Sequence, residues 1–291
     1  MADSNEREAN LEAGVRMMKT VDGIEYAFHW CPAGTFLMGS PKTLTEDDGW
    51  TYDETQHEVT LTRGFWMLET LVTVGMFRSF TKDTGYESQG DPPYGWDENG
   101  EELVQDSKYS WEAPGFSQDD AHPVVCVSWN DAVTFCKWLS EKTGLNVTLP
   151  TEAQWEYACR AGTTTPFSFG KTLNGDEANC DGTEPYGTDE KGPYLARTTP
   201  VRSYAPNAWG LYDMHGNAGE WCVDVHDDYP EEAVTDPISC PIDCNDDALY
   251  RVIRGGGWDF TANGCRSACR YLNSQRSREH SVGFRPVAAG E

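Results

Sequence analysis

Short runs of alternating apolar and polar residues, separated by glycine and proline, make up most of this chain. Residues 24–39, IEYAFHWCPAGTFLMG, alternate apolar with small or polar side chains and break at Pro32 and Gly34, which predicts two strands joined by a turn. Residues 57–73, HEVTLTRGFWMLETLVT, are rich in β-branched and aromatic side chains and predict further strands. Because the 28 glycines and 16 prolines are spread singly between such runs, we expect many turns and short elements rather than long helices.

Two segments show the periodicity of a helix. Residues 128–144, SWNDAVTFCKWLSEKTG, place apolar side chains at helical spacing, begin with a serine and an asparagine that can cap the first turn, and stop at Gly144. Residues 149–162, LPTEAQWEYACRAG, predict a second helix, because Thr151 and Gln154 have the spacing of a capping box. Amphipathic helices normally bury one face, so we interpret both as scaffold.

Long stretches of the remaining sequence lack periodicity. Residues 1–20 are polar and charged and are predicted to form a flexible tail, which leaves residues 21–291 as a single domain. Residues 163–208 contain glycine, proline, asparagine and aspartate throughout, and residues 226–248 form a second irregular, acidic stretch. Irregular segments of this length are unusual in a folded domain unless a ligand or a metal organises them.

The charge of the chain limits the classes of molecule that it is expected to bind. With 22 Lys and Arg against 48 Asp and Glu, the formal net charge is −26, which repels phosphate backbones and disfavours nucleic-acid binding. This acidity serves either solubility or the binding of divalent cations. No run of about 18 apolar residues predicts a membrane span, and residues 1–14 lack the pattern of a signal peptide, so a cytoplasmic location is the default expectation.

The ten cysteines do not have the spacing of a zinc site or a thioredoxin-like motif, because none forms a CxxC pair. The close pairs along the chain are Cys240 with Cys244 and Cys265 with Cys269. Ten cysteines could form five disulfides, but their spacing alone leaves their redox state open.

Seven phrases of the sequence form a set that extends from residue 32 to residue 287. They are PAGTFLMGS at 32–40, HEVTLTRGFWMLETLVT at 57–73, HPVVCVSWNDAVTFCKWL at 122–139, LPTEAQWEYACRAGT at 149–163, PNAWGLYDMHGNAGEW at 206–221, RVIRGGGW at 251–258 and GFRPV at 283–287. In this order and at this spacing they resemble the sulfatase-modifying-factor family, which includes the formylglycine-generating enzymes. The resemblance implies a single α+β domain with an irregular, C-type-lectin-related fold of short strands, two main helices and long ordered loops.

The oxidases of that family bind copper through two cysteines that follow a GGS-aromatic phrase, since paired soft thiolates suit Cu(I). The corresponding stretch here, residues 259–265, contains only Cys265. When positions are counted forward from GGGW, Phe260 takes the place of the first catalytic cysteine and Cys265 that of the second. When positions are counted backward from GFRP, neither catalytic cysteine is present. Cys265 is therefore a catalytic candidate only for an oxidase with an altered copper site, which Cys269 could complete. It is otherwise interpreted as a buried thiol or as a disulfide partner of Cys159.

The resemblance also implies two calcium sites built from carboxylate, amide and main-chain oxygens, which are ligands that Ca²⁺ accepts. The first would comprise the Asn179 side chain, the Cys180 carbonyl and Asp189 or Glu190. The second would comprise Asp213, the carbonyls of Gly216 and Ala218, and Glu220. Gly219 stands where the family usually has tryptophan, which removes a packing residue from the second loop. The alternative is that these carboxylates are solvated or hydrogen-bonded loop residues.

The segment 258–281 mixes aromatic, charged and small residues between two fixed phrases, in a way that suits ligand recognition. Its candidate ligand-binding residues are Trp258, Asp259, Phe260, Asn263, Cys269, Tyr271, Asn273, Arg276, Arg278 and His280. We expect Phe260 and Tyr271 to lie on the surface rather than in the core. The segment also resembles the variable region of retroelement-diversified proteins, which share the fold and end in GFR.

The leading hypothesis is therefore a binding module that keeps the family scaffold without the standard copper pair and recognises a protein or a small molecule. The alternative is a copper-dependent oxidase that converts a protein cysteine to formylglycine, as in sulfatase activation. Metal content separates the two hypotheses, because stoichiometric copper favours the oxidase whereas calcium alone favours the binding module.

Overall fold

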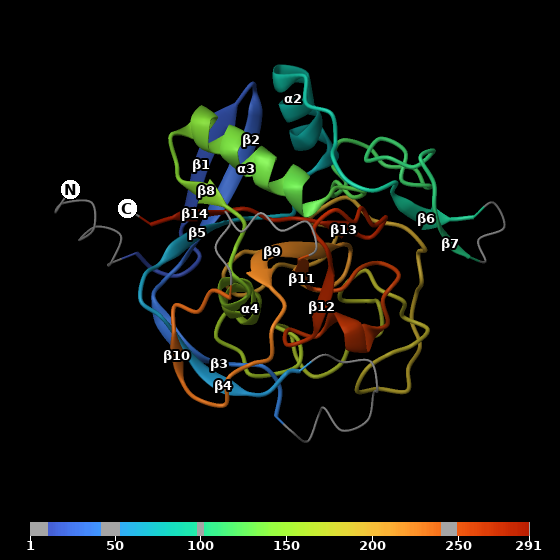
Figure 1. Cartoon of the computed structure of the whole chain (residues 1–291). Helices are drawn as coiled ribbons and strands as arrows, with labels where there is room; N and C mark the ends of the chain where they lie inside the picture. Colours follow the sequence, from blue (N-terminus) through green and yellow to red (C-terminus); the bar gives the residue numbers. More distant parts are fainter. Residues whose placement is uncertain (1–10, 42–52, 98–101, 240–248, 291) are drawn as a thin grey trace.

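Four β-sheets and three α-helices form the described parts of the chain, which are residues 11–41, 53–97, 102–239 and 249–290 of a computed structural model (Figure 1). Strands and helices are mixed along the chain without a repeating unit, so the predicted α+β class with one irregular domain is confirmed. Among the described helices there is none with the length and apolar character that crossing a bilayer requires.

The main sheet is antiparallel and has five strands in the order β1-β2-β5-β14-β8. The strands are β1 (Arg16–Val21), β2 (Ile24–Cys31), β5 (Phe65–Leu68), β14 (Val287–Ala289) and β8 (Val147–Thr148). Strand β1 pairs with β2 from Arg16 to Val21, which corrects the predicted tail: residues 16–20 belong to the sheet. Residues 1–10 of that tail lie outside the described residues.

Three smaller sheets surround the second half of the chain. The three-stranded sheet contains β10 (Val234–Thr235), β4 (His57–Leu61) and β3 (Gly34–Met38). The four-stranded sheet contains β12 (Arg270–Ser274), β11 (Tyr250–Arg254), β9 (Gly219–Val225) and β13 (Val282–Gly283), and the two-stranded sheet contains β6 (Tyr94–Trp96) and β7 (Leu103–Gln105). The strands predicted in residues 24–39 are confirmed as β2 and β3, but they belong to different sheets.

The two predicted helices are present with the expected start signals. Helix α3 (Trp129–Thr143) begins after Ser128, whose side chain accepts a hydrogen bond from the first turn. Helix α4 (Glu152–Arg160) begins with the predicted capping box, in which Thr151 and Gln154 each bond the other's backbone N–H. Local side-chain spacing therefore identifies both helices correctly.

A third helix, α2 (Val74–Thr84), goes beyond the sequence prediction. Thr73 caps it, and Gly85 ends it in the left-handed conformation at φ 67°. Phe77 and Phe80 on its buried face contact the core. Its start is hidden in the sequence because the preceding β-branched and aromatic run continues into the N-cap residue without a break.

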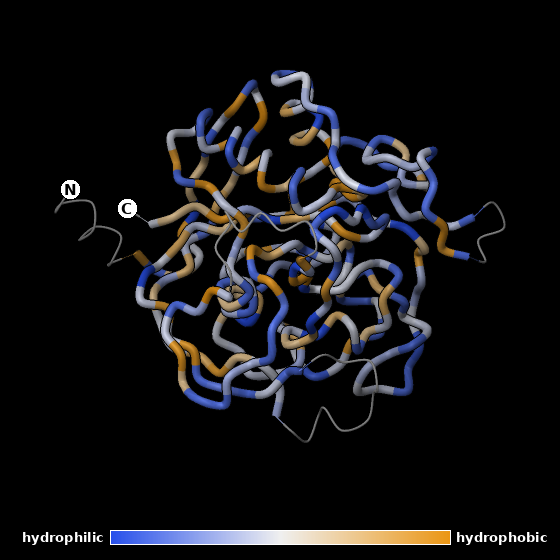
Figure 2. The backbone as a smooth tube through the Cα atoms, in the orientation of Figure 1, coloured by the Kyte–Doolittle hydropathy of each residue, from blue (hydrophilic) through white to orange (hydrophobic). Residues whose placement is uncertain are grey.

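The largest apolar core lies between the main sheet and helices α2 and α3. Phe135 stacks against Phe77 with ring centroids 6.1 Å apart and meets Phe284 edge-on at 5.3 Å. Figure 2 shows hydrophobic positions on the inner segments and hydrophilic ones along the peripheral loops. The aromatic core thus joins helix α3 to helix α2 and to the C-terminal segment that contains Phe284.

Every residue of the irregular segment 163–208 is described, and the segment contains no helix or strand, which confirms the sequence prediction. It instead encloses a small apolar cluster, here called the loop cluster, with the turn that precedes β12. The loop cluster comprises Phe167, Leu173, Ala178, Cys180, Ala262 and Cys265. Cys240 and Cys244 fall in residues 240–248, which lie outside the described residues.

Candidate functional site

The predicted ligand-binding segment, residues 258–281, lies between strands β11 and β13 of the four-stranded sheet. After Trp258 it makes the short 3-10 turn η2 (Ala262–Cys265), continues as β12 and returns toward β13. The return brings His280 beside Asp259, and the Trp258 indole N–H donates to the His280 carbonyl at 3.3 Å. The two ends of the segment therefore meet at one place.

Asp259 and His280 form a buried pair whose hydrogen-bonding capacity is unfilled. His280 Nε2 lies 3.2 Å from Asp259 Oδ2, and the two side chains are 2% and 14% exposed. Among the described residues, Asp259 Oδ1 and both ring nitrogens of His280 have no hydrogen-bond partner. Buried polar atoms are nearly always hydrogen-bonded to protein or to water. Such open positions therefore indicate a place where a ligand or ordered water completes the structure.

Aromatic rings surround this pair. The Trp258 ring centroid lies 5.1 Å from that of His280 and 5.4 Å from that of Phe116, and Tyr194 stacks on Trp258 at 6.4 Å. Trp96 meets the His280 ring edge-on at 6.0 Å. Tyr194 and Trp96 are 41% and 39% exposed, so they form the outer wall. We call this set the polar–aromatic site; it comprises Trp96, Phe116, Tyr194, Trp258, Asp259 and His280.

Sequence reasoning identifies only half of the polar–aromatic site. Trp258, Asp259 and His280 belong to the predicted segment, whereas Trp96, Phe116 and Tyr194 come from three other parts of the chain. Each of those three is an isolated aromatic residue between glycines, prolines and polar residues, and such a context carries no signal of shared location.

Several other predicted ligand-binding residues have partners inside the protein. Asn273 donates to Glu279 Oε1 at 2.9 Å. Arg276 Nε lies 3.2 Å from Asp91 Oδ1, and Arg278 Nε donates to the Asp91 carbonyl at 2.6 Å. The Asn273 contact lies within the segment, whereas the two arginine contacts fasten the segment to the loop before β6. All three side chains therefore position the segment in this structure.

Phe260 and Tyr271 pack against each other, with ring centroids 4.6 Å apart at 78°. Both are half-buried: Phe260 contacts the loop cluster and Tyr271 contacts the main core, so the expected surface exposure is met only in part. Burial, and then the neighbouring Cys269, raise the pKa of Tyr271 well above its ordinary value. Cys269 itself is buried, and Asn263 accepts a hydrogen bond from Arg266 Nε at 2.7 Å.

The cysteine arrangement differs from the predicted disulfide. Cys265 is a free, fully buried thiol, which confirms one of its two interpretations. The disulfide with Cys159 is wrong for this structure, because Cys159 is also free and its sulfur lies 3.6 Å from Ser267 Oγ. Cys265 lies with Cys180 in the loop cluster, and its thiol donates to the Gly257 carbonyl at 4.0 Å. The described residues hold no group of three or more His, Cys, Asp or Glu that could bind a metal ion.

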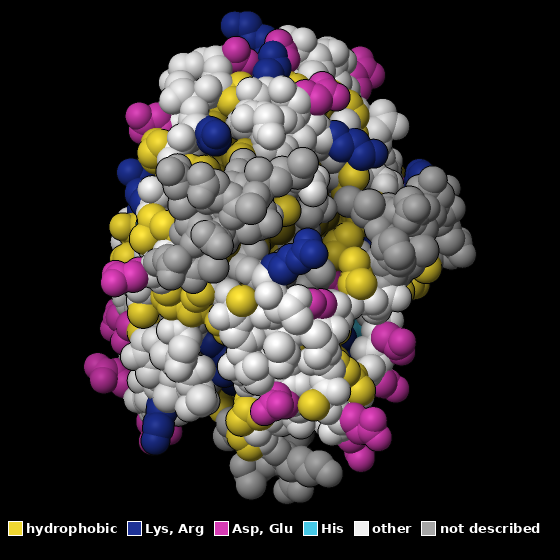
Figure 3. Space-filling view, turned by 90° about the vertical axis from the view of Figure 1, so that its left-hand side faces the viewer, with side chains coloured by type: hydrophobic (Ala, Val, Ile, Leu, Met, Phe, Trp, Pro, Cys, Tyr) yellow, Lys and Arg dark blue, Asp and Glu magenta, His cyan; other side chains and the backbone are white. Residues whose placement is uncertain are grey.

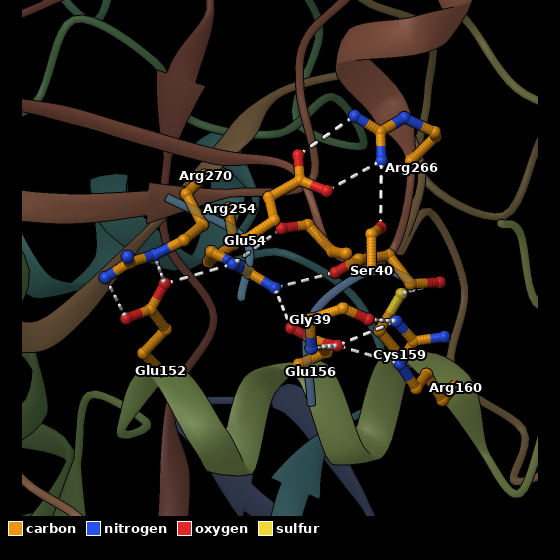
Figure 4. A network of polar contacts seen from close by, with 12 residues as sticks. Gly39, Ser40, Glu54, Glu152, Glu156, Cys159, Arg160, Arg254, Arg266 and Arg270 are labelled. Carbon is orange, nitrogen blue, oxygen red and sulfur yellow. Dashed lines mark hydrogen bonds and ion pairs between the residues drawn. The ribbon is translucent and has the colours of Figure 1, made fainter. Parts of the chain in front are cut away.

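Beneath the ligand-binding segment, buried arginines meet glutamates of helix α4 (Figure 4). Arg270 donates twice to Glu152, at 2.7 and 2.9 Å, and Arg254 pairs with both Glu152 and Glu156. Burial alone would raise the pKa of Glu152, but the charges of Arg254 and Arg270 outweigh it and hold that pKa below its ordinary value. We call this set the buried charge network; it comprises Glu54, Glu152, Glu156, Arg160, Arg254, Arg266 and Arg270.

The first predicted calcium site contains one oxygen that fits a metal ligand. Asn179 Nδ2 donates to Asn217 Oδ1 at 3.1 Å, whereas Asn179 Oδ1 is buried without a partner among the described residues. An amide oxygen left open in this way suits Ca²⁺. Asp189 and Glu190 are exposed, so neither is held in place as an acidic ligand.

The second predicted calcium site is already satisfied by protein groups. The carboxylate of Glu220 accepts hydrogen bonds from Arg285, at 2.7 to 3.1 Å, and from Trp155 Nε1 at 2.7 Å. Asp213 accepts a main-chain N–H, and burial raises its pKa to about 6. The carbonyl of Gly216 also accepts a main-chain N–H. These residues therefore do not fit a calcium site as they stand.

A cavity of about 400 Å³ lies beside strand β10 and the start of α4. Asp224 is a buried acid in its lining, and burial raises the pKa of Asp224 to about 6. Asp224 accepts main-chain hydrogen bonds from Ser239 at 2.9 Å and from Glu152 at 2.7 Å, and Arg270 in the same wall is paired with Glu152. Because these groups already have partners, the cavity is a weaker candidate than the polar–aromatic site.

On the face shown in Figure 3, acidic side chains are scattered rather than gathered into one patch.

Comparison with known proteins gives consistent matches over nearly the whole chain. Residues 21–289 match the family described as Sulfatase-modifying factor enzyme 1-like domain. The formylglycine-generating enzyme of Streptomyces coelicolor is 30% identical over 287 residues, which cover 87% of this chain and 86% of that protein.

Two solved structures resemble the fold. The structure of PvdO from Pseudomonas aeruginosa is 31% identical, covers 96% of this chain and 99% of its own, and has a TM-score of 0.73. Variable protein 1 of Treponema denticola is 23% identical, covers 94% of this chain and 99% of its own, and has a TM-score of 0.70. At that identity the second likeness concerns the fold alone.

Proposed function

We propose that this chain, which belongs to the Sulfatase-modifying factor enzyme 1-like domain family, is a ligand-binding member of it and holds its ligand at the polar–aromatic site. The observation that carries the proposal is the buried Asp259–His280 pair with its unfilled hydrogen-bonding positions. The ligand is a protein or a small molecule that presents a hydrogen-bond donor to Asp259 and an apolar or aromatic face to Trp96 and Tyr194.

The energetics support this choice of site. A buried polar atom without a partner costs about 1–3 kcal/mol of folding stability, so the Asp259–His280 pair lowers the stability of the free protein. A ligand that supplies the missing partners recovers this cost on binding. The exposed rings of Tyr194 and Trp96 add contact area at a small cost in side-chain entropy, as aromatic residues commonly do in binding sites.

Thermal-shift screening of the full chain against amino acids, monosaccharides, nucleosides and short peptides tests the proposal. We expect at least one class to raise the melting temperature, and calorimetry to show that Asp259→Ala and His280→Ala abolish its binding. The matched control is Glu58→Ala, which removes an exposed carboxylate on strand β4. Hits that bind both site variants as well as the wild type would contradict the proposal.

The alternative function is a copper-dependent oxidase that forms formylglycine. It is supported by the named activity of the Streptomyces relative and by the free thiol of Cys265. Against it stands Phe260 at the position of the first catalytic cysteine in one alignment. A Cu(I) centre requires paired soft ligands, so the altered stretch disfavours the oxidase.

Retroelement diversification of the ligand-binding segment is a separate proposal. It is tested by sequencing sister copies from the same genome. Variation confined to residues 259–281, with Trp258 and the flanking strands unchanged, is the expected pattern. Variation spread evenly over the chain would exclude a diversified segment.

A further inference from the structure

Two cysteines belong to the loop cluster, and the ligand-binding proposal makes no use of them. The side chain of Cys180 comes from the irregular segment 163–208, and that of Cys265 comes from the turn η2. The two residues are 1% and 0% exposed. We propose that Cys180 and Cys265 form a disulfide that fastens the irregular segment to the ligand-binding segment.

The backbone on both sides of these cysteines is already aligned. The N–H of Asp181 donates to the carbonyl of Phe260 at 2.8 Å, and Asp181 forms a parallel bridge with Thr261. The N–H of Ala262 donates to the carbonyl of Glu184 at 3.2 Å. Disulfides require close, facing Cβ atoms and tolerate little distortion. These backbone contacts hold the two segments side by side, and the shared apolar cluster brings the two cysteines together as that requirement demands.

Neighbouring cysteines do not compete for the pair. Cys269 is not part of the loop cluster, and Cys159 and Cys136 belong to two other apolar clusters. Cys180 and Cys265 are therefore the two cysteines that share one cluster with the aligned backbone.

The reaction is a thiol–disulfide exchange with a small-molecule disulfide such as oxidised glutathione. One cysteine loses its proton and attacks a sulfur of the oxidant, which releases one glutathione thiolate. The second cysteine then attacks the mixed disulfide, the Cys180–Cys265 bond forms, and a second glutathione leaves. Two electrons pass to the oxidant, and the two thiol protons end on the two glutathione thiols.

The environment sets the rate of this reaction. Interaction with Cys180, and then burial, raise the pKa of Cys265 well above its ordinary value. Few thiolates are therefore present in the folded protein, so we expect slow oxidation that accelerates as the pH rises. Once formed, the bond encloses residues 181–264 and removes conformational freedom from the unfolded chain.

The test is to incubate the native full-length chain with oxidised glutathione at pH 8.5 until the reaction stops. Free thiols are then alkylated in denaturant, and peptides are mapped by mass spectrometry without reduction. We expect one peptide pair linking Cys180 to Cys265, with Cys136 alkylated throughout as an internal control. We also expect the oxidised protein to melt several degrees above the reduced one.

Two variants show whether the thermal shift comes from this bond. Cys180→Ala should abolish the difference in melting temperature between oxidised and reduced protein, whereas Cys136→Ala should retain it. If either variant fails to fold, the peptide map of the wild type still decides. Full alkylation of Cys180 and Cys265 after oxidation, or a link from Cys265 to Cys269 or Cys159, would overturn the proposal.

Discussion

The buried charge network and the polar–aromatic site differ in how their buried charges are paired. In the network, both oxygens of Glu152 and of Glu156 accept hydrogen bonds from the protein. In the polar–aromatic site, Asp259 Oδ1 and the His280 ring nitrogens accept and donate none among the described residues. The two sets share the same stretch of chain, since Arg270 follows Asp259 within residues 258–281.

This difference separates the residues that stabilise the fold from those that we propose bind a ligand. Burying a charge is tolerated when other protein groups complete it, and such a group is then strongly coupled to the fold. A buried polar group that the protein leaves without a partner lowers the stability of the free protein, and a ligand that supplies the partner recovers this cost. We therefore expect substitutions in the network to change the free energy of unfolding, and substitutions in the polar–aromatic site to change binding.

The largest effect should follow from Glu156→Ala. Its removal leaves the buried guanidinium group of Arg160 without its counter-charge and leaves Arg254 with Glu152 alone, and breaking a buried pair in this way costs about 3–5 kcal/mol. Urea denaturation measures the loss, with Glu58→Ala as the exposed control, for which we expect a change within about 0.5 kcal/mol. A loss below about 1 kcal/mol for Glu156→Ala would show that the network is not a scaffold.

Phe260→Ala and Tyr271→Ala should have intermediate effects. Complete burial of a large aromatic residue makes truncation cost about 3–5 kcal/mol, and these two are half-buried, so we expect about 2 kcal/mol each. This outcome opposes the expectation from sequence that both lie on the surface. Tyr194→Ala, which truncates a ring that is 41% exposed, is the matched control and should leave the melting temperature nearly unchanged.

Removal of calcium should have an effect of similar size that depends on Asn179. If Ca²⁺ binds the open Asn179 oxygen at 100 times its dissociation constant, it adds about 2.7 kcal/mol, so excess EDTA should lower the melting temperature by about 5 °C. Asn179→Ala should melt at the same temperature with and without EDTA. An unchanged wild-type melting curve, together with purified protein free of calcium, would remove the site.

His280→Leu should change stability by less than about 1 kcal/mol. His280→Leu removes two ring nitrogens that lack hydrogen-bond partners among the described residues, and this gain offsets the loss of the 3.2 Å contact with Asp259. The surrounding rings of Trp96 and Trp258 provide an apolar lining for the new side chain. Glu156→Gln provides the comparison, because it keeps the shape of a satisfied network residue and removes its charge. Equal losses of several kcal/mol for both variants would abolish the distinction between the two regions.

The smallest expected effect is on sulfatase-type peptides. With copper supplied, the chain should leave the cysteine of a CxPxR peptide unconverted, because Phe260 replaces one of the paired soft ligands in the forward alignment. Mass spectrometry detects the formylglycine aldehyde. Its appearance in the wild type and its loss in Cys265→Ser would establish the oxidase and place the activity outside the Asp259–His280 pair.

Local signals in the sequence predict local structure well. Helices α3 and α4 carry their own capping residues within three positions of their starts, so the sequence contains what the backbone needs. Strand partners are different, because pairing depends on residues far away. Gly34 illustrates the point: a Cβ atom there would lie 2.3 Å from the Tyr157 hydroxyl, so the need for glycine at the start of β3 depends on a residue of helix α4.

The candidate site divides in the same way. Trp258, Asp259 and His280 are predictable because one segment carries them between recognisable phrases. The aromatic wall from Trp96 and Tyr194 requires the tertiary fold, since no periodicity relates those positions. The structural role of Arg270 cannot be predicted from the sequence either, because it depends on pairing with Glu152 of the distant helix α4.

Strand β14 determines when this domain can fold during synthesis. It lies between β5 and β8, so the main sheet is split until residues 287–289 have left the ribosome. Arg285, just before it, also donates to the carbonyls of Leu68 and Glu69 from the opposite part of the sequence. Pairings over such sequence separations form late and slowly. A nascent chain that still lacks residues 287–289 therefore has no strand to join β8 to the rest of the main sheet, and it exposes the unpaired edge of β5.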